Sequence, residues 1–587
     1  MKKQIFLFQL LFLIITSSVN SQSLMDYIAG QKGDTLVVKD YHDMGDQPNS
    51  LYWALTLDTD NVPSGRVYEL KANGYYPLTK NPTTIRNTII VGEDNTILVN
   101  NENASSHPPL ICGATGSGEY GNNTGGINFM HDLTVKNCII VLATENGYSG
   151  LIFFYGQADR VKLTLENCLI ERTLWAFTVT YNKDISWHFK DCYFVNMSGK
   201  WHRRSGGVFH VFAPQDTLLV ENCTHIMASG YLYRFWQFPF KRIIFNHNTF
   251  INCAGVIFQD FGYQSASSTT NNIFVNCNVQ PYCDVLASWD VSEFDPDTLA
   301  IGLVNVHALP DSFVQLDRKY LFKNNVVYWD PKLGDIVSTL NETNVNGVND
   351  WTDQMVIMNE RTQAMFDDNE SYPYLTEGKL YQELPNFSDS QDLLTTQLDS
   401  VKAYVIAIVD TNGARPLPTW RLVNTGQEDY VHPDWPIPVD LSYNNAELLT
   451  GATNGFPVGD LNWFPDKKVQ WNAQRKSEYD SIEYQLGSTV VNVVGKSNLV
   501  NGFKLQQNYP NPFNPSTTIN YDLPKQSKVK MVVYDILGRE VTTLVDEPKK
   551  AGSYQVRWNA SRFASGLYFC RIQAGDYIAT KKLVLLK

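Results

Sequence analysis

The chain has 587 residues, which is too long for a single ordinary hydrophobic core, so we expect two or more domains. Aromatic residues make up 13% of it, and Asn, Thr, Val, Phe and Tyr are plentiful, which favours β structure. The net charge of -13 argues against general nucleic-acid binding, because a phosphate backbone calls for a basic surface.

Residues 1–21 are typical of a secretory signal peptide. Lys2 and Lys3 precede an apolar run from Ile5 to Ile15, small residues follow, and cleavage is predicted before Gln22. The run is shorter than the roughly 20 apolar residues of a membrane-spanning helix, and no later segment is apolar enough to be one. We therefore expect an exported, soluble mature protein without a transmembrane segment.

A repeated pattern dominates the middle of the chain. Segments such as LTVKNCIIV, LTLENCLIER and WHFKDCYFVN alternate apolar and polar residues around one aligned position, with no helical stretch between them. The intervals between aligned residues are 30, 24, 31, 25, 24 and 53, and we interpret the last as about two repeats. The aligned position is occupied in chain order by Cys138, Cys168, Cys192, Cys223, Asn248, Asn272 and Asn325.

Short strands at this spacing predict a solenoid of parallel strands, a β-helix, with coils stacked about 4.8 Å apart. The aligned residues then form a ladder inside it, where asparagine satisfies buried backbone groups and the small cysteine fits the same place. Packing is the favoured role of the cysteines, with one or two disulfides as the alternative in an exported protein. No cysteine pair has the close spacing of a zinc site.

The NNxFxNC turns, as in 271–277, resemble right-handed parallel β-helix proteins of the pectate-lyase-like superfamily. This resemblance covers about 30–360 and implies the fold, with regular coils at about 85–360. It leaves the reaction open, because the fold carries lyases, hydrolases, esterases and non-catalytic proteins. We expect the whole β-helix domain to span 22–494.

An irregular closing segment is expected at about 361–494. It contains one predicted helix, SQDLLTTQLDSVKAYV, and the aromatic and glycine-rich stretch 446–464. The turn with Gly459, Asp460 and Trp463 is similar to one that closes exported β-helix proteins of Bacteroidetes-type bacteria. A loop laid back over the solenoid is an equal interpretation, and no ligand site is predicted there.

The pattern changes again after a linker at 495–502. Strict alternation, as in KVKMVVYDI, and turns at Gly538, Gly552 and Gly566 predict a small immunoglobulin-like β-sandwich. The motifs in YPNPFNPSTTINYDLP, GSYQVRWNAS and ASGLYFCRI resemble the type A C-terminal sorting domain of type IX secretion, over 503–587. That resemblance implies the type IX machinery as a partner, and export through the outer membrane of a Gram-negative bacterium to the cell surface or beyond.

Common catalytic motifs are absent from the sequence, so a site is predicted from the register of the coils. Aligning Gly199, Gly230 and Gly255 places Arg203 beside Arg234, and the same alignment stacks His202 with Tyr233 and Arg204 with Phe235 and Asp260. The result is a basic and aromatic patch on an acidic protein. The catalytic candidates are Lys200, Arg203, Arg204 and Arg234, and the candidate substrate-binding residues are His202, Tyr231, Tyr233, Trp236 and Asp260.

Such a patch suits a uronic-acid polysaccharide, because arginine binds carboxylates and aromatic rings stack on sugars. The first hypothesis is a polysaccharide lyase with Lys200 or Arg234 as the base, Arg203 and Arg204 on the substrate carboxylate, and Ca²⁺ as a candidate cofactor. The second is a non-catalytic cell-surface protein for glycan binding or adhesion. A structural alternative for the patch is ion pairing with acidic neighbours, namely Glu171, Asp184, Glu221 or Asp260.

Overall fold

The structure is a computed structural model, and it divides into two compact units, Met1–Thr489 and Val490–Lys587, which we take one at a time. It describes residues 22–586 except for the following segments: 94–105, 114–124, 144–149, 174, 198–206, 237, 261–265, 282–301, 307–317, 343–350, 389–390, 408–431, 434, 487–502, 506, 509–510, 550–551 and 576. The predicted signal peptide lies outside the described residues.

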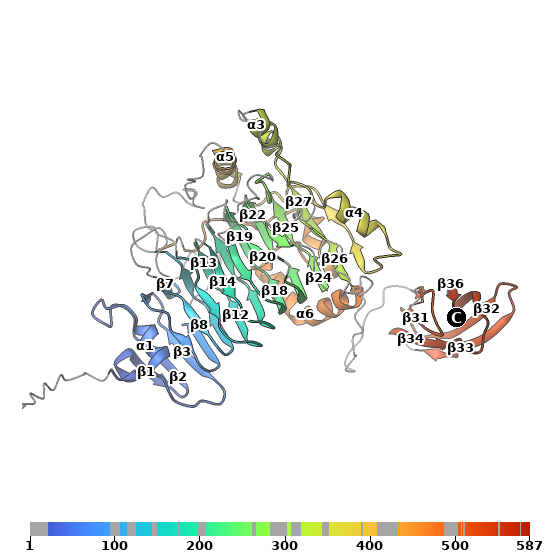
Figure 1. The fold of residues 1–587 in the computed structure, drawn as a ribbon, viewed down its shortest axis with the longest axis horizontal. Coiled ribbons are helices and arrows are strands. Elements are labelled where there is room, and N and C mark those ends of the chain that lie inside the picture. The colour runs from blue at the N-terminus through green and yellow to red at the C-terminus, as the bar shows by residue number, and fades with distance from the viewer. Residues whose placement is uncertain are drawn as a thin grey trace, which may run out of the picture. The chain divides into compact units, whose positions relative to one another are not determined.

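The first unit is a parallel β-helix built from three sheets (Figure 1). Sheet A begins with an antiparallel pair and continues as parallel strands, in the order β1 (Ile28–Lys32), β2 (Thr35–Val38), β3 (Arg66–Leu70), β6 (Thr88–Gly92), β9 (Leu133–Lys136), β12 (Lys162–Glu166), β15 (Ser186–Lys190), β18 (Gln215–Glu221), β21 (Phe240–Asn246), β24 (Ala266–Thr270), β26 (Lys319–Lys323) and β28 (Leu375–Glu377).

Each coil passes from sheet A to sheet B and, in most coils, to sheet C. Sheet B contains β4 (Tyr75–Leu78), β7 (Leu110–Gly113), β10 (Ile139–Val141), β13 (Leu169–Glu171), β16 (Tyr193–Val195), β19 (Thr224–Ala228), β22 (Thr249–Cys253), β25 (Ile273–Val275), β27 (Asn325–Tyr328) and β29 (Leu380–Tyr381). Sheet C contains β5 (Thr83–Thr84), β8 (Ile127–Phe129), β11 (Phe154–Gly156), β14 (Ala176–Thr180), β17 (Gly207–Val211), β20 (Tyr233–Trp236) and β23 (Phe258–Asp260).

One detail of the predicted repeat needs correction. Parallel pairing begins between β2 and β3, within the expected domain and before the regular coils expected from about residue 85. The 53-residue interval is one coil rather than two, because β25 pairs directly with β27 and β24 with β26. A long insertion between β25 and β26 produced the false count.

The predicted ladder is confirmed. Strand registers align Cys138, Cys168, Cys192, Cys223, Asn248, Asn272 and Asn325 in successive coils. All are buried, and the asparagines are linked along the solenoid: the backbone N–H groups of Asn248 and Asn272 each donate to the side-chain oxygen of the next asparagine at 2.9 Å. Ladder asparagines thus satisfy backbone groups that water cannot reach.

The packing role of the cysteines is confirmed for those that the structure describes. Eight described cysteines are buried free thiols, while Cys283 lies in a segment outside the described residues. Burial raises the pKa of the Cys138, Cys168 and Cys192 thiols well above the usual value, so they are unreactive.

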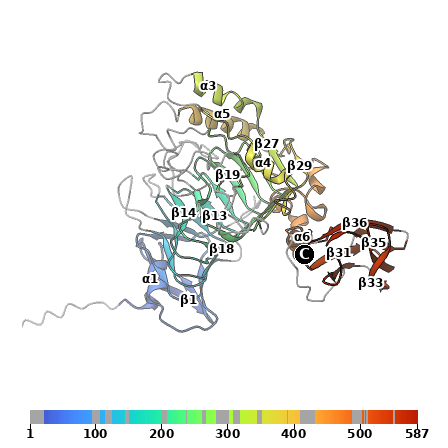
Figure 2. The same cartoon turned by 45° about the vertical axis from the view of Figure 1, so that its right-hand side comes forward.

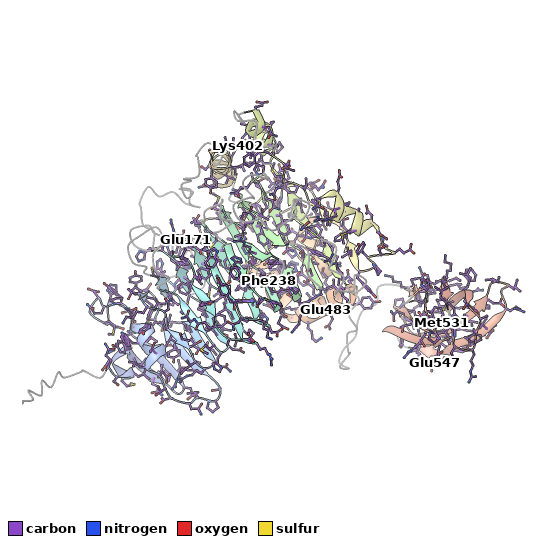
Figure 3. The ribbon with its side chains drawn as sticks, viewed as in Figure 1. Glu171, Phe238, Lys402, Glu483, Met531 and Glu547 are labelled. Atoms are coloured by element: carbon purple, nitrogen blue, oxygen red, sulfur yellow. The ribbon has the colours of Figure 1, made fainter. Side chains whose placement is uncertain are left out.

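A second apolar layer covers the outer face of sheet B. The helices α3 (Ile336–Glu342) and α5 (Gln391–Ala407) lie side by side over it (Figure 2). Lys402 of α5 bonds Asp335 at 2.6 Å, just before α3 begins (Figure 3). The helix predicted over 390–405 is confirmed as α5. At the two ends of the solenoid, α1 (Ser50–Leu57) and α4 (Glu360–Asp367) add side chains to the interior core.

Residues 446–485, which we call the strap, run along the corner between sheets A and B. The strap includes three short 3₁₀ helices (Leu448–Thr450, Thr453–Gly455 and Leu461–Trp463) and the helix α6 (Pro465–Gln485). At this corner each coil turns through a residue with positive φ, which Asn and Asp tolerate best. The strap contacts five successive turn residues, namely Asp191, Asn222, His247, Asn271 and Asn324.

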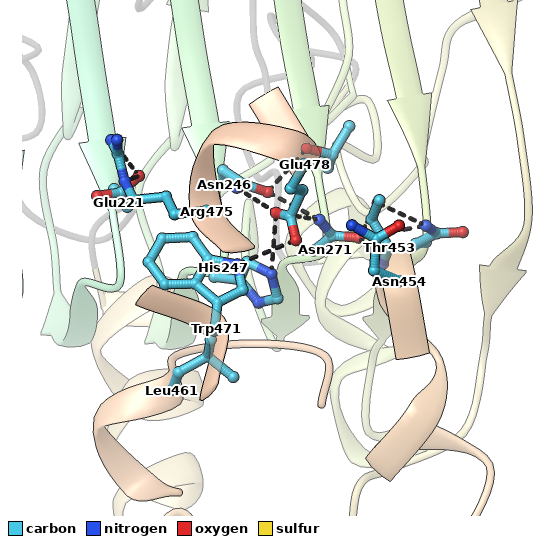
Figure 4. A network of polar contacts seen from close by, with 12 residues as sticks. Glu221, Asn246, His247, Asn271, Thr453, Asn454, Leu461, Trp471, Arg475 and Glu478 are labelled. Atoms are coloured by element: carbon cyan, nitrogen blue, oxygen red, sulfur yellow. Dashed lines mark hydrogen bonds and ion pairs between the residues drawn. The ribbon is translucent and has the colours of Figure 1, made fainter. Parts of the chain in front are cut away.

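Glu478 is the centre of the contact between strap and solenoid (Figure 4). It lies fully buried with its Oε1 3.2 Å from Nε2 of His247. The side-chain amide of Asn246 donates to the same oxygen at 2.8 Å, and the indole of Trp471 donates to Oε2 at 3.0 Å. The loop laid back over the solenoid, one of the two interpretations of 446–464, is therefore what the structure contains.

The second unit is an antiparallel β-sandwich, as predicted. One sheet contains β30 (Lys504–Leu505), β31 (Ser516–Leu523) and β34 (Gly552–Asn559). The other contains β33 (Glu540–Lys549), β32 (Ser527–Asp535), β35 (Gly566–Ala574) and β36 (Tyr577–Leu585). Their inner faces enclose a separate apolar core that includes Met531, Trp558 and Ile572.

Candidate functional site

Only part of the predicted patch can be placed. Lys200, His202, Arg203 and Arg204 fall in 198–206, outside the described residues. Trp236 ends β20 and Asp260 ends β23, and the structure describes their backbone but not their side chains. The described members are Tyr231, Tyr233 and Arg234.

The register that linked these residues differs from the prediction. Arg234 pairs with His210 of β17 on one side and with Gln259 on the other, so Arg203 is not its strand neighbour. Likewise Tyr233 pairs with Phe209 rather than His202. An irregularity after Arg234 sets Asp260 opposite Trp236 instead of Phe235. The alignment on glycines failed because 198–206 precedes the strand that enters the sheet.

Tyr233 lies in the solenoid interior instead of on its surface. It is fully buried, and its hydroxyl shares a 2.8 Å hydrogen bond with Nε2 of His225. His225 is itself stacked between Phe194 and Phe250, and burial lowers its pKa to about 3. Tyr231 is half-buried against the cluster outside sheet B. Neither tyrosine shares a face with Arg234.

Aromatic side chains gather instead on the outer face of sheet C, in a group that we call the shelf: Tyr155, Trp175, Tyr181, His210 and Phe212. Tyr181 and Phe212 stack with their ring centroids 4.4 Å apart and their planes 5° apart. His210 lies 4.2 Å from Phe212 and 5.5 Å from Trp175, centroid to centroid. Tyr181 is 56% exposed, so the shelf presents an aromatic surface to solvent.

The shelf continues along the solenoid because of the parallel register. Thr84, Phe129, Gly156, Thr180 and Val211 are successive partners in sheet C. The residues that follow them therefore form a straight row, the outer row, which consists of Ile85, Met130, Gln157, Tyr181 and Phe212. Ile85 is 58% exposed and Met130 43%. Large exposed apolar residues in one line mark a binding surface more often than scattered ones do.

His210 of the shelf and its strand neighbour Arg234 supply the polar groups at this place. They are paired neighbours on the outer side of sheet C, and both are buried. Burial and the positive charge of Arg234 hold the pKa of His210 well below its usual range, so the imidazole is neutral at neutral pH. The arrangement combines a proton acceptor, a fixed positive charge and apolar ring faces.

Residues 507–586 match the family model for a secretion system C-terminal sorting domain. The tail directs the chain through type IX secretion to the cell surface or the outside. No curated protein and no solved structure matches the chain. The sorting-domain match agrees with the predicted tail at 503–587 and concerns the second unit alone.

Two features of the described residues bear on the partners of the chain. No helix of the described residues is long and apolar enough to cross a membrane. Within the same residues, no group of three or more His, Cys, Asp and Glu side chains is arranged to hold a metal ion. Ca²⁺ as a cofactor stays a prediction.

None of the five shelf residues was among the site residues predicted from the sequence. Tyr155, Trp175, Tyr181 and Phe212 come from three different coils and share no motif. One signal was present: GVFHVF follows the same alternation as YLYRFW, and aligning Phe209 with Tyr233 would have placed His210 beside Arg234. The shared position of Tyr181 and Phe212 follows from the same register.

Proposed function

We propose that the β-helix binds an acidic polysaccharide on the outer face of sheet C, after export by type IX secretion. The observation that carries this proposal is the stacked pair of Tyr181 and Phe212, of which Tyr181 is 56% exposed. The C–H faces of sugar rings are apolar and flat, so an exposed ring stacked on a second one is a suitable platform.

The length of the outer row favours a polymer over a single sugar as the ligand. Four coil steps separate Ile85 from Phe212, which is about 19 Å at about 4.8 Å a step. One sugar unit is about as long as one step. Arg234 favours uronate units, because its positive charge lies beside the shelf and acts at short range on carboxylates.

Binding can be tested by affinity electrophoresis of the purified full chain in gels that contain pectate, alginate or chondroitin. Tyr181→Ala should weaken retention about tenfold in the gel that retains the native chain. Tyr484→Ala is the matched control, since Tyr484 is an exposed tyrosine on α6 and should leave retention unchanged. Retention that is equal in the native chain and Tyr181→Ala would remove the shelf from the proposal.

A preference for uronates makes a separate prediction. Methyl-esterified pectin has the same rings as pectate with few of the carboxylates, so it should retain the chain more weakly. The difference should shrink as salt is added, because screening acts on the charged contact and not on ring stacking. Equal retention by both polymers would mean that the shelf binds sugar rings without regard to their carboxylates.

Lyase activity is the second candidate, and the pairing of His210 with Arg234 favours it. A neutral imidazole can accept the proton next to a uronate carboxylate, and an arginine can stabilise the charge that develops there. The unsaturated product of β-elimination absorbs in the ultraviolet. Incubation with pectate, alginate and chondroitin should raise absorbance, and His210→Ala or Arg234→Ala should abolish the rise. Retention without any such rise would leave a non-catalytic glycan-binding or adhesion protein.

A further inference from the structure

The sorting tail differs in charge from the rest of the chain. Residues 503–587 contain 13 Lys and Arg against 6 Asp and Glu, a net charge of +7, whereas the whole chain has -13. A charge of this sign on a short domain produces a local field that attracts anionic partners. Charge alone identifies no surface, so the question is where the basic side chains lie.

Three of them form a diagonal stripe on one face of the sandwich. Lys530 of β32, Arg571 of β35 and Lys582 of β36 are exposed on three adjacent strands. Lys530 pairs with Gln573, Arg571 with Val532 and Lys582 with Phe569, so each basic residue is set two positions along from the last. We call Lys530, Arg571 and Lys582 the basic stripe.

The stripe lies on the solvent side of its sheet. Residues that alternate with it, Met531, Cys570 and Leu583, point into the core of the sandwich and are buried. None of the ion pairs found among the described residues includes a stripe residue. Apolar side chains flank the charges, with Ile578 50% exposed and Phe569 half-buried, and one exposed acidic residue, Asp546 of β33, lies opposite Lys530.

A mixed basic and apolar face of this kind fits the surface of an acidic protein. Charged residues at the edge of an interface speed association and select partners, while apolar ones between them add contact area. The family match supplies the class of partner, since a sorting domain has to be bound by the secretion system. Exposed basic residues also lie outside this sheet, Lys504, Arg557 and Arg562 among them, so the alignment of the stripe and not the presence of basic residues distinguishes it.

We propose that the basic stripe is the surface through which the tail docks on an acidic protein of the export machinery. This proposal concerns the tail alone and is independent of the polysaccharide proposal. Replacing Lys530, Arg571 and Lys582 together by Glu reverses the charge of the stripe. The matched control replaces three exposed residues outside that sheet, Lys504, Arg557 and Arg562, by Glu. It changes the net charge by the same amount.

The test follows export of the full chain from the native cell, by fractionation into periplasm and exterior. The stripe variant should reach the exterior about tenfold less than the native chain and accumulate in the periplasm, while the control variant is exported normally. Normal export of both variants, or equal retention of both, overturns the proposal. Thermal melting of each purified variant checks folding, and a variant with Gln at the three stripe positions decides the matter if the Glu variant does not fold.

A lipid surface is the competing partner for a basic stripe. Purified full chain can be mixed with vesicles of phosphatidylglycerol and, separately, of phosphatidylcholine. The proposal expects no difference between the native chain and the stripe variant in either mixture. If the native chain binds phosphatidylglycerol vesicles and the stripe variant does not, the stripe binds anionic lipid. That result would overturn the proposal of a protein partner.

Discussion

Asparagine and cysteine occupy one ladder position because both can donate to the same backbone oxygen. The thiol of Cys223 lies 3.4 Å from the carbonyl oxygen of Phe189, and the amide of Asn272 lies 3.1 Å from that of Phe245, which is the equivalent place one coil back. Asparagine adds an acceptor for the next backbone N–H, which a thiol provides poorly. The two residue types are thus unequal solutions to one requirement.

This difference between the two residue types predicts that Asn272→Leu destabilises the fold more than Asn272→Cys does. Asn272→Leu removes the donor to Phe245 and the acceptor that serves Asn248, and should lower the free energy of unfolding by roughly 2–5 kcal/mol. Asn272→Cys keeps a donor and should cost about half as much. Urea denaturation of both variants measures the difference. Equal losses would show that the donated bond contributes nothing.

Asp460 is a second buried polar residue with a measurable signature. It accepts a hydrogen bond from the hydroxyl of Thr224 at 2.5 Å and one from the backbone of Asn462 at 2.8 Å. Burial nevertheless raises its pKa to about 7, and Asp191 adds to the rise while Lys468 opposes it. Burial prevails over the hydrogen bonds, so the neutral acid is the favoured form of Asp460 in the folded chain below about pH 7.

The sign of the pH effect follows from that raised pKa. Between about pH 4 and pH 7 the folded chain binds a proton that the unfolded chain has lost, so stability falls as pH rises through this window. Asp460→Asn cannot titrate and should become more stable relative to the native chain from pH 4 to pH 8, by at most about 4 kcal/mol. Melting temperatures across this range provide the measurement. A constant gap between the two proteins would contradict the prediction.

At the scale of elements, the β-helix could be predicted and α6 could not. Strand pairing with period 2 and a recurrent turn residue leave a signal in every coil, and the predicted ladder was correct at all seven positions. The buried side of α6 carries Trp471, Glu478 and Ile482, which is too polar to produce an apolar stripe. Its polarity is explained by what it covers, a line of asparagine and histidine turns.

The candidate site could be predicted only in part for a related reason. Arg234 lies beside aromatic side chains and His210, but its strand partners depend on how many residues each loop inserts. The alignment on Gly199 set 198–206 against β20, whereas the alternation shared by GVFHVF and YLYRFW favoured the register in which His210 lies beside Arg234. Side chains that meet across coils are thus harder to predict than the coils themselves.

The strap makes its own prediction through Glu478. Glu478→Ala leaves Asn246, His247 and Trp471 without their shared buried acceptor, and should lower the free energy of unfolding by about 3–5 kcal/mol. The pKa of Glu478 is lowered, because the interactions with these neighbours outweigh the opposing effect of burial. Glu478 is therefore charged, and its removal leaves buried donors without an acceptor.

Asp480→Ala is the control on the same helix. Asp480 bonds Lys476, which is 86% exposed, so its loss should change stability by at most about 1 kcal/mol. Chemical denaturation of the two variants compares them under one condition. Similar losses would mean that α6 as a whole, and not the Glu478 contact, determines the stability.

At the scale of the whole molecule, the order of the chain has a consequence. The strap is the last part of the β-helix unit and directly precedes the sorting tail, so the solenoid corner is covered only once nearly all of that unit has been made. Until then, the turn residues Asn222, His247 and Asn271 lack the partners that the strap supplies. Stability of the first unit should therefore depend on 446–485 and be independent of the tail.

Two truncations separate these dependences. A chain that ends at 489 keeps the strap and loses only the sorting unit, so it should melt within a few degrees of the β-helix transition of the full chain, because the tail has a core of its own. A chain that ends at 445 exposes the corner between sheets A and B along five coils and should be cut by trypsin at least about tenfold faster. Differential scanning calorimetry and timed proteolysis measure the two effects. If the chain that ends at 445 resists trypsin like the longer one, the strap is an accessory layer, and the solenoid closes without it.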